Sequence, residues 1–121
     1  FFLNMEVGCF EVPAIVILKL LEEFSRSGHT VAKYIKPYQK YYHSGEINSV
    51  VPNKEKIFKA IEEKYYDGRI NKLDGITVEY DDFWFNLRPS NTEPLLRLNV
   101  EADSRQLLDK KTKQLLDLIR S

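Results

Sequence analysis

The chain has 121 residues, 43% of them hydrophobic and 12% aromatic, which is enough to bury a core in one domain or in one domain plus part of another. Its 18 basic and 18 acidic residues give a formal net charge of zero, so we expect no nucleic-acid partner, since such modules normally carry a basic excess. No run of about 18 apolar residues is present, so we expect no membrane span, and the single cysteine fits a cytoplasmic location.

The first predicted element is a helix over residues 12–28. Pro13 suits the first helical turn, where its missing N–H loses no hydrogen bond, and Ser27-Gly28 can end the helix. The apolar side chains recur at helical spacing, at Ile17, Leu20, Leu21 and Phe24. The first half of this helix is apolar on all sides and therefore requires burial on more than one side.

The following stretch, residues 29–48, has a different composition. A short helical turn from Thr30 to Ile35 is expected to end at Pro37, and several tyrosines and Gly45 follow. Aromatic residues with polar tips, together with a proline and a glycine, are typical of a connector between two folded units. We therefore predict a boundary here, with one part over residues 1–43 and a domain over residues 44–121.

The rest of the chain predicts a compact α+β unit. Asn53 can cap a helix that runs to about Tyr66, and Ser104 can cap a final helix. Alternation of apolar and polar residues predicts four strands, near 47–51, 76–80, 83–88 and 96–102. The order β-α-β-β-β-α implies a small, mostly antiparallel four-stranded sheet with helices packed on one face.

The segment RPSNTEP (88–94) concentrates groups that bind oxyanions. A guanidinium can bind phosphate in bidentate fashion, while hydroxyl and amide groups supply further hydrogen bonds. Because Leu87 and Leu98 point to the core, Arg88 and Arg97 must leave adjacent strands on the opposite, helix-free face. The candidate phosphate-binding residues are Arg88, Ser90, Asn91, Thr92 and Arg97.

Structural roles compete with this interpretation. The segment could be a polar hairpin loop, and Ser90 and Asn91 could be turn formers that bond their own backbone. The two arginines could pair with Glu79 and Glu101 across the exposed sheet face. Glu93 does not suit a phosphate ligand, because a carboxylate repels phosphate, but it could orient Arg97 or face a sugar hydroxyl.

The string RPSNTEPLLRLNVEA (88–102) resembles the phosphate-binding loop of the α-D-phosphohexomutase family, the phosphomannomutases and phosphoglucomutases. The resemblance extends through LDGITVEYDDFWFN (73–86) and, more loosely, SGEIN (44–48). It implies that residues 44–121 form the TBP-like C-terminal domain of such an enzyme and that residues 1–43 end its third domain. By match to the loop, Arg88, Ser90, Asn91 and Thr92 would hold the phosphate of a hexose phosphate, with Arg97 as a supporting cation.

The resemblance also implies that the reaction belongs to other domains. In this family a phosphoserine and a Mg²⁺ ion held by aspartates convert hexose 1-phosphate to hexose 6-phosphate through a bisphosphorylated sugar. We find neither group in this sequence, so we predict no catalytic and no metal-binding residues here and an inactive 121-residue chain. The other domains of the parent mutase are its expected partners, and the sequence does not decide which hexose is bound. The alternatives are a free-standing phosphosugar-binding module and a protein-interaction domain.

Overall fold

The computed structural model describes residues 2–5 and 8–121, which divide into two compact units, Phe1–Gln39 and Lys40–Ser121. The first unit opens with an antiparallel hairpin of β1 (Phe2–Met5) and β2 (Gly8–Glu11), which the sequence analysis did not predict. Helix α1 (Pro13–Ser27) follows and agrees with the predicted helix. Gly28 ends it in the left-handed conformation, at a φ of 63°, which glycine adopts without a steric penalty.

The rest of the first unit is a short helix, α2 (Val31–Ile35), and a 3₁₀ turn, η1 (Lys36–Tyr38). Thr30 caps α2, and the rings of Phe24 and Tyr34 meet edge to face with centroids 5.1 Å apart. No residue of α1 is buried, even though its sequence is largely apolar. No helix in the described part of the chain is both long enough and apolar enough to cross a membrane.

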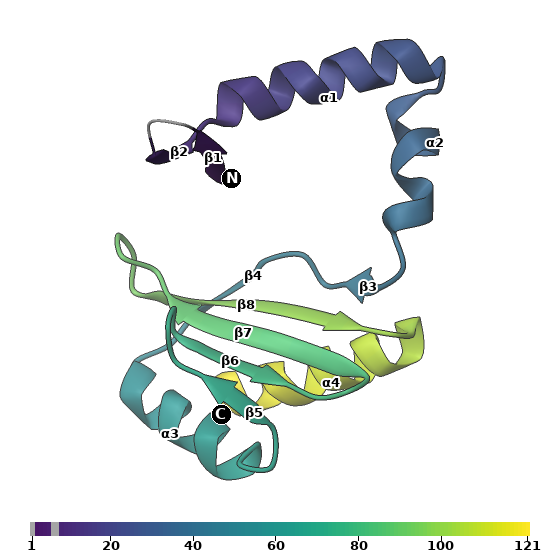
Figure 1. The fold of residues 1–121 in the computed structure, drawn as a ribbon. Helices are drawn as coiled ribbons and strands as arrows, with labels where there is room; N and C mark the ends of the chain where they lie inside the picture. The colour runs from purple at the N-terminus through teal and green to yellow at the C-terminus, as the bar shows by residue number, and fades with distance from the viewer. Residues whose placement is uncertain (1, 6–7) are drawn as a thin grey trace. The chain divides into compact units, whose positions relative to one another are not determined.

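The second unit is built on one antiparallel sheet (Figure 1). Its strands lie in the order β3-β8-β7-β6-β5, and β4 also pairs with β8. Their bounds are β3 (Tyr42–His43), β4 (Ile47–Val50), β5 (Arg69–Asn71), β6 (Ile76–Glu79), β7 (Phe83–Pro89) and β8 (Leu95–Ala102). The α+β class is confirmed, but the predicted count of four strands is wrong. Strands β3 and β5 have two and three residues, all exposed, so they carry no alternation that a sequence can reveal.

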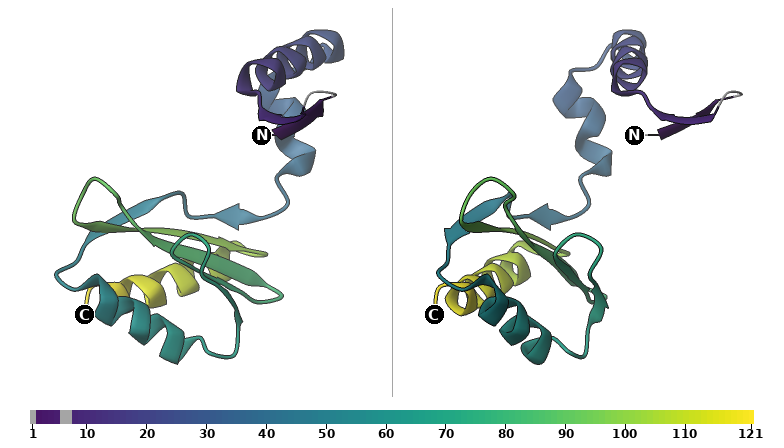
Figure 2. Two further views of the ribbon diagram at one scale, coloured as in Figure 1. Left: turned by 60° about the vertical axis from the view of Figure 1, so that its left-hand side comes forward. Right: turned by 90° about the vertical axis from the view of Figure 1, so that its left-hand side faces the viewer.

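Helices α3 (Lys54–Lys64) and α4 (Arg105–Ile119) cover one face of this sheet (Figures 1 and 2). Both begin at the predicted caps: Asn53 accepts a hydrogen bond from the Lys56 N–H, and Ser104 accepts one from the Leu107 N–H. Helix α3 ends two residues earlier than predicted. The other face of the sheet carries no helix of this unit (Figure 2).

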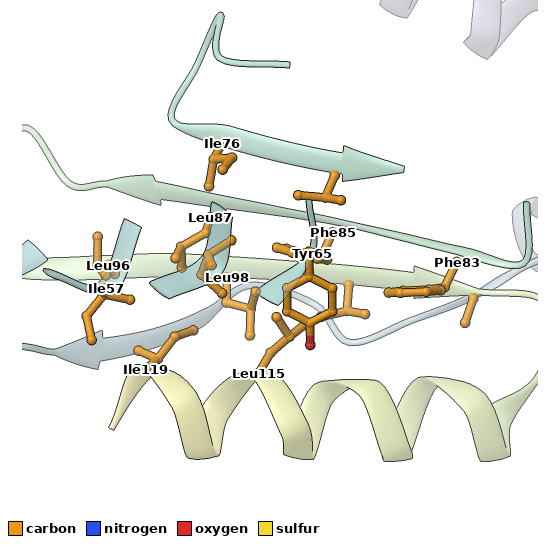
Figure 3. Packing of buried hydrophobic residues seen from close by; sticks show 14 of the residues in the cluster. Ile57, Tyr65, Ile76, Phe83, Phe85, Leu87, Leu96, Leu98, Leu115 and Ile119 are labelled. Atoms are coloured by element: carbon orange, nitrogen blue, oxygen red, sulfur yellow. The ribbon is translucent and has the colours of Figure 1, made fainter. Parts of the chain in front are cut away.

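The core lies between the sheet and these two helices (Figure 3). Along β7 and β8 buried and half-buried residues alternate, as the predicted strand phase requires. Phe85 lies at the centre and its ring packs edge to face on Tyr65, with centroids 5.0 Å apart. Because every second residue of these strands is committed to the core, the intervening residues must face the open side of the sheet.

Candidate functional site

Arg88 and Arg97 occupy directly opposed positions on β7 and β8. The preceding pair in the register, Leu87 and Leu98, is buried in the core, so both arginines project from the helix-free face, as the strand phase predicted. Like charges placed directly opposite each other in a sheet are destabilising. The pair therefore needs a negative partner.

Two carboxylates supply that charge. Glu46 Oε2 lies 3.3 Å from Arg88 Nη2, and Glu46 Oε1 lies 3.5 Å from Arg97 Nη1. Asp74 Oδ2 lies 3.4 Å from Arg88 Nη1. The alternative pairing with Glu79 and Glu101 is wrong, because Glu79 lies 3.5 Å from Arg69 and Glu101 stands opposite Trp84. Glu46 and Asp74 lie in the loops that precede β4 and β6, and composition does not reveal which loop residues meet the arginines.

The loop after β7 is closed by its own hydrogen bonds. The Ser90 N–H donates to the Leu95 carbonyl at 3.0 Å, and the Leu95 N–H donates to the Glu93 carbonyl at 2.8 Å. Ser90 is buried, with 8% of its surface exposed, and its Oγ accepts from the Thr92 N–H at 3.4 Å. The turn-forming role considered for Ser90 is thus present, and its hydroxyl remains next to Thr92 Oγ1, at 3.4 Å.

Arg97 connects this loop to Glu46. Its Nη2 lies 3.5 Å from Ser90 Oγ, while its Nη1 faces Glu46. Its Nε is buried and has no hydrogen-bond partner among the described residues. Of the five predicted ligands, the structure joins Arg97, Ser90 and Thr92 directly, and it links Arg88 to them only through Glu46. Asn91 is exposed in the loop between β7 and β8.

Gly75 lets the segment that carries Asp74 approach β7 closely. Its φ is +68°, and a Cβ at this position would lie 2.3 Å from the Leu87 carbonyl oxygen and 2.7 Å from Arg88 Cα. Asn86 Nδ2 donates to the Asp74 carbonyl at 2.9 Å and so fastens the same segment. A glycine is therefore required where the chain passes beside Arg88.

The far side of the loop is held from α3. Lys54 Nζ donates to the Glu93 carbonyl at 3.4 Å, so Glu93 contributes its backbone oxygen to this contact. The sequence analysis overlooked four residues around this site, namely Glu46, Lys54, Asp74 and Gly75. Only the Asp74-Gly75 dipeptide, a common turn pair, carried a local signal. No group of three or more His, Cys, Asp or Glu side chains in the described ranges is placed to hold a metal ion.

Comparison with known proteins identifies the family. The model of the family described as "Phosphoglucomutase/phosphomannomutase, C-terminal domain" matches residues 46–118. The chain belongs to this family. The resemblance found in the loop and its flanking strands is thereby confirmed, and the matched residues lie within the second unit, which is the family's C-terminal domain.

Individual relatives agree with this assignment. A phosphomannomutase of Methanocaldococcus jannaschii is 41% identical over 114 residues, covering 94% of this chain and 25% of that protein. A protein of Xanthomonas campestris named "Phosphohexose mutases" is 36% identical over 113 residues, covering 90% and 25%. A probable phosphoglucosamine mutase of Pyrococcus horikoshii is 31% identical over 109 residues, covering 88% and 24%. The chain thus spans about a quarter of the length of these relatives.

Proposed function

We propose that residues 88–97 bind the phosphate group of a hexose phosphate. The observation that carries this proposal is the convergence on the Ser90 hydroxyl of Arg97 Nη2, the Thr92 hydroxyl and the Thr92 N–H, each 3.4–3.5 Å from Ser90 Oγ. All of these groups can donate hydrogen bonds, and Arg88 adds a second positive charge on the same face. Donors of this kind recognise a phosphate dianion.

The role that we propose for the site is to hold and align the substrate. A phosphate gripped far from the reacting atoms contributes binding energy that orients the reacting group. In the longer protein we propose interconversion of hexose 1-phosphate and hexose 6-phosphate through a phosphoserine and a bisphosphorylated sugar. The phosphoserine and the Mg²⁺ site would lie in other domains, and Mg²⁺ would stabilise charge on the transferred phosphoryl group. The loop 88–97 would grip the phosphate that is not being transferred.

The distribution of roles among the arginines follows from their contacts. Arg97 already points a nitrogen at the loop, so it can contact a phosphate placed beside Ser90 without rearrangement. Arg88 has both terminal nitrogens facing carboxylates and contributes chiefly positive potential until one of these contacts opens. We therefore assign Arg97 a larger role than a supporting cation.

An NMR titration tests the proposal. Glucose 1-phosphate and mannose 1-phosphate, added to the 121-residue chain at millimolar concentration, should shift amide resonances concentrated at residues 88–97, whereas glucose without phosphate should not. Affinity should be weak, because one phosphate site lacks the rest of the cleft. Absence of shifts with both sugar phosphates would contradict the proposal. In a coupled mutase assay we expect no turnover by this chain, because it lacks the phosphoryl-transfer groups.

A further inference from the structure

Glu46 is the one carboxylate in the described residues that contacts both arginines of the site. Each of its oxygens faces a different guanidinium, at 3.3 Å to Arg88 and 3.5 Å to Arg97. The Glu46 side chain is about two thirds buried, with 34% of its surface exposed. An ion pair in that environment is screened less by water than a surface pair is.

The backbone on both sides of Glu46 is fastened to β8. Ser44 exchanges hydrogen bonds with Val100, donating from its N–H at 2.9 Å and accepting at its Oγ at 3.0 Å. Ile47 begins β4 and pairs with Leu98. The backbone of Glu46, in the loop before β4, is therefore anchored on both sides to β8, the strand that carries Arg97.

The planar guanidinium of Arg97 transmits this constraint to the loop. Its two terminal nitrogens face different groups, Nη1 toward Glu46 and Nη2 toward Ser90 Oγ. Its Nε finds no partner among the described residues, so Glu46 is the charged group that sets the angle of the plane. Fixing Nη1 in a rigid fork fixes the direction of Nη2. Without Glu46 the plane would keep only its contact with the neutral Ser90 hydroxyl, while the positive charge of Arg88 would no longer be balanced by a carboxylate that contacts both arginines.

Asp74 provides a natural comparison. It contacts Arg88 at 3.4 Å, is 72% exposed and lies on the opposite side of β7 from Glu46 in the sheet order. Replacing either carboxylate by its amide removes one negative charge near the same arginine. A simple counter-ion effect would make both replacements favour anion binding. Only the replacement of Glu46 changes what holds Arg97.

We propose that Glu46 is a positioning residue of the phosphate site, which neutralises the opposed arginine pair and aims Arg97 at the loop. This inference rests on the proposed function of residues 88–97. It assigns the carboxylate a supporting role at Arg97 Nη1, whereas the phosphate would contact Nη2, the nitrogen that lies next to Ser90. Binding should therefore depend on Glu46 even though its charge has the same sign as the ligand.

The test compares Glu46→Gln, Glu46→Asp and Asp74→Asn with the unmodified 121-residue chain, using titration of inorganic phosphate and glucose 1-phosphate. We expect the Kd to rise roughly fivefold in Glu46→Gln, in line with the loss of a partly exposed ion pair to Arg97. Glu46→Asp should restore part of the lost affinity for phosphate. Asp74→Asn should leave the Kd unchanged or lower it by about twofold, since it only removes a repelling charge.

A second readout separates positioning from general damage to the fold. The Arg97 Nε–Hε resonance should shift on phosphate addition in the unmodified chain and in Asp74→Asn, and this response should be lost in Glu46→Gln. The backbone amide spectrum of each variant reports whether the sheet is intact, and Glu46→Asp keeps the test decisive if Glu46→Gln does not fold.

Three outcomes would overturn the inference. A Kd in Glu46→Gln equal to or lower than that of the unmodified chain would show that Glu46 only competes with the ligand. An equal rise in Glu46→Gln and Asp74→Asn would remove any special role for Glu46. If the unmodified chain binds neither ligand, the proposed function itself fails and this inference fails with it. In the first two outcomes phosphate binding by residues 88–97 would still stand.

Discussion

Strands β7 and β8 carry two consecutive cross-strand pairs, Leu87–Leu98 and Arg88–Arg97, that point to opposite faces of the same sheet. The leucine pair is buried beneath α3 and α4, where contacts between apolar groups stabilise the fold. The arginine pair is about one third exposed and is held by carboxylates at 3.3–3.5 Å, which are loose contacts. The core face therefore stabilises the fold, while the opposite face carries the charged groups that we propose bind phosphate, and a one-residue step along each strand separates the two.

The largest expected effect lies on the core face. Phe85 has no exposed surface, so Phe85→Ala should lower the free energy of unfolding by about 3–5 kcal/mol, measured by urea denaturation. Trp84 is the matched control on the open face. Because Trp84 is only partly buried, Trp84→Ala should lower the free energy of unfolding by less than about half that amount. Equal losses at the two positions would contradict the division between the faces.

An intermediate effect on stability is expected at Gly75, which directly precedes β6 and lies against Leu87 and Arg88. Gly75→Ala places a methyl group against the Leu87 carbonyl and the Arg88 backbone and also strains a residue at a φ of +68°. Gly45 has the same φ, and a methyl group added there would meet nothing within 4 Å, so Gly45→Ala measures the backbone strain alone. We expect the free energy of unfolding to fall by about 1–2 kcal/mol in Gly45→Ala and by clearly more in Gly75→Ala, measured by thermal or urea unfolding. Similar losses of stability in the two variants would show that the close approach of Gly75 to Arg88 does not add to the cost of the substitution.

The smallest expected effect is at Lys54, which contacts the loop from α3. The contact is exposed and 3.4 Å long, so Lys54→Ala should change the free energy of unfolding by less than about 0.5 kcal/mol. The loss of one nearby positive charge should weaken binding of glucose 1-phosphate by about two- to threefold at low salt, and by less as salt screens the site. Urea denaturation measures the first quantity, and an NMR titration at two salt concentrations measures the second. A loss of affinity that did not depend on salt would argue against an electrostatic role for Lys54.

Much of the fold could be predicted because its signals are local. Caps at Asn53 and Ser104 and the alternation along β7 and β8 depend only on neighbouring residues, and these features agree with the structure. The phase of the strands was enough to place both arginines on the open face. The short strands β3 and β5 were missed because exposed segments of two or three residues show no alternation.

The partners of the arginines could not be predicted for a different reason. Glu46 is 42 residues from Arg88 in the chain, and Asp74 is 14 residues from it. Both carboxylates lie in loops, before β4 and before β6, and the alternation of residues within strands does not show where a loop residue will lie. The sequence analysis consequently considered Glu79 and Glu101, acidic residues of the neighbouring strands, and overlooked the pair that the fold brings together.

The central claim is that the open face binds phosphate while the core face stabilises the fold. Arg97→Ala tests both halves when its unfolding free energy and its Kd for glucose 1-phosphate are measured on the same preparation. We predict a Kd at least about tenfold higher, because a charged donor is lost, with a change in the free energy of unfolding below about 1 kcal/mol. An unchanged Kd together with a loss of several kcal/mol in stability would contradict the account, because Arg97 would then act as a structural residue of the sheet.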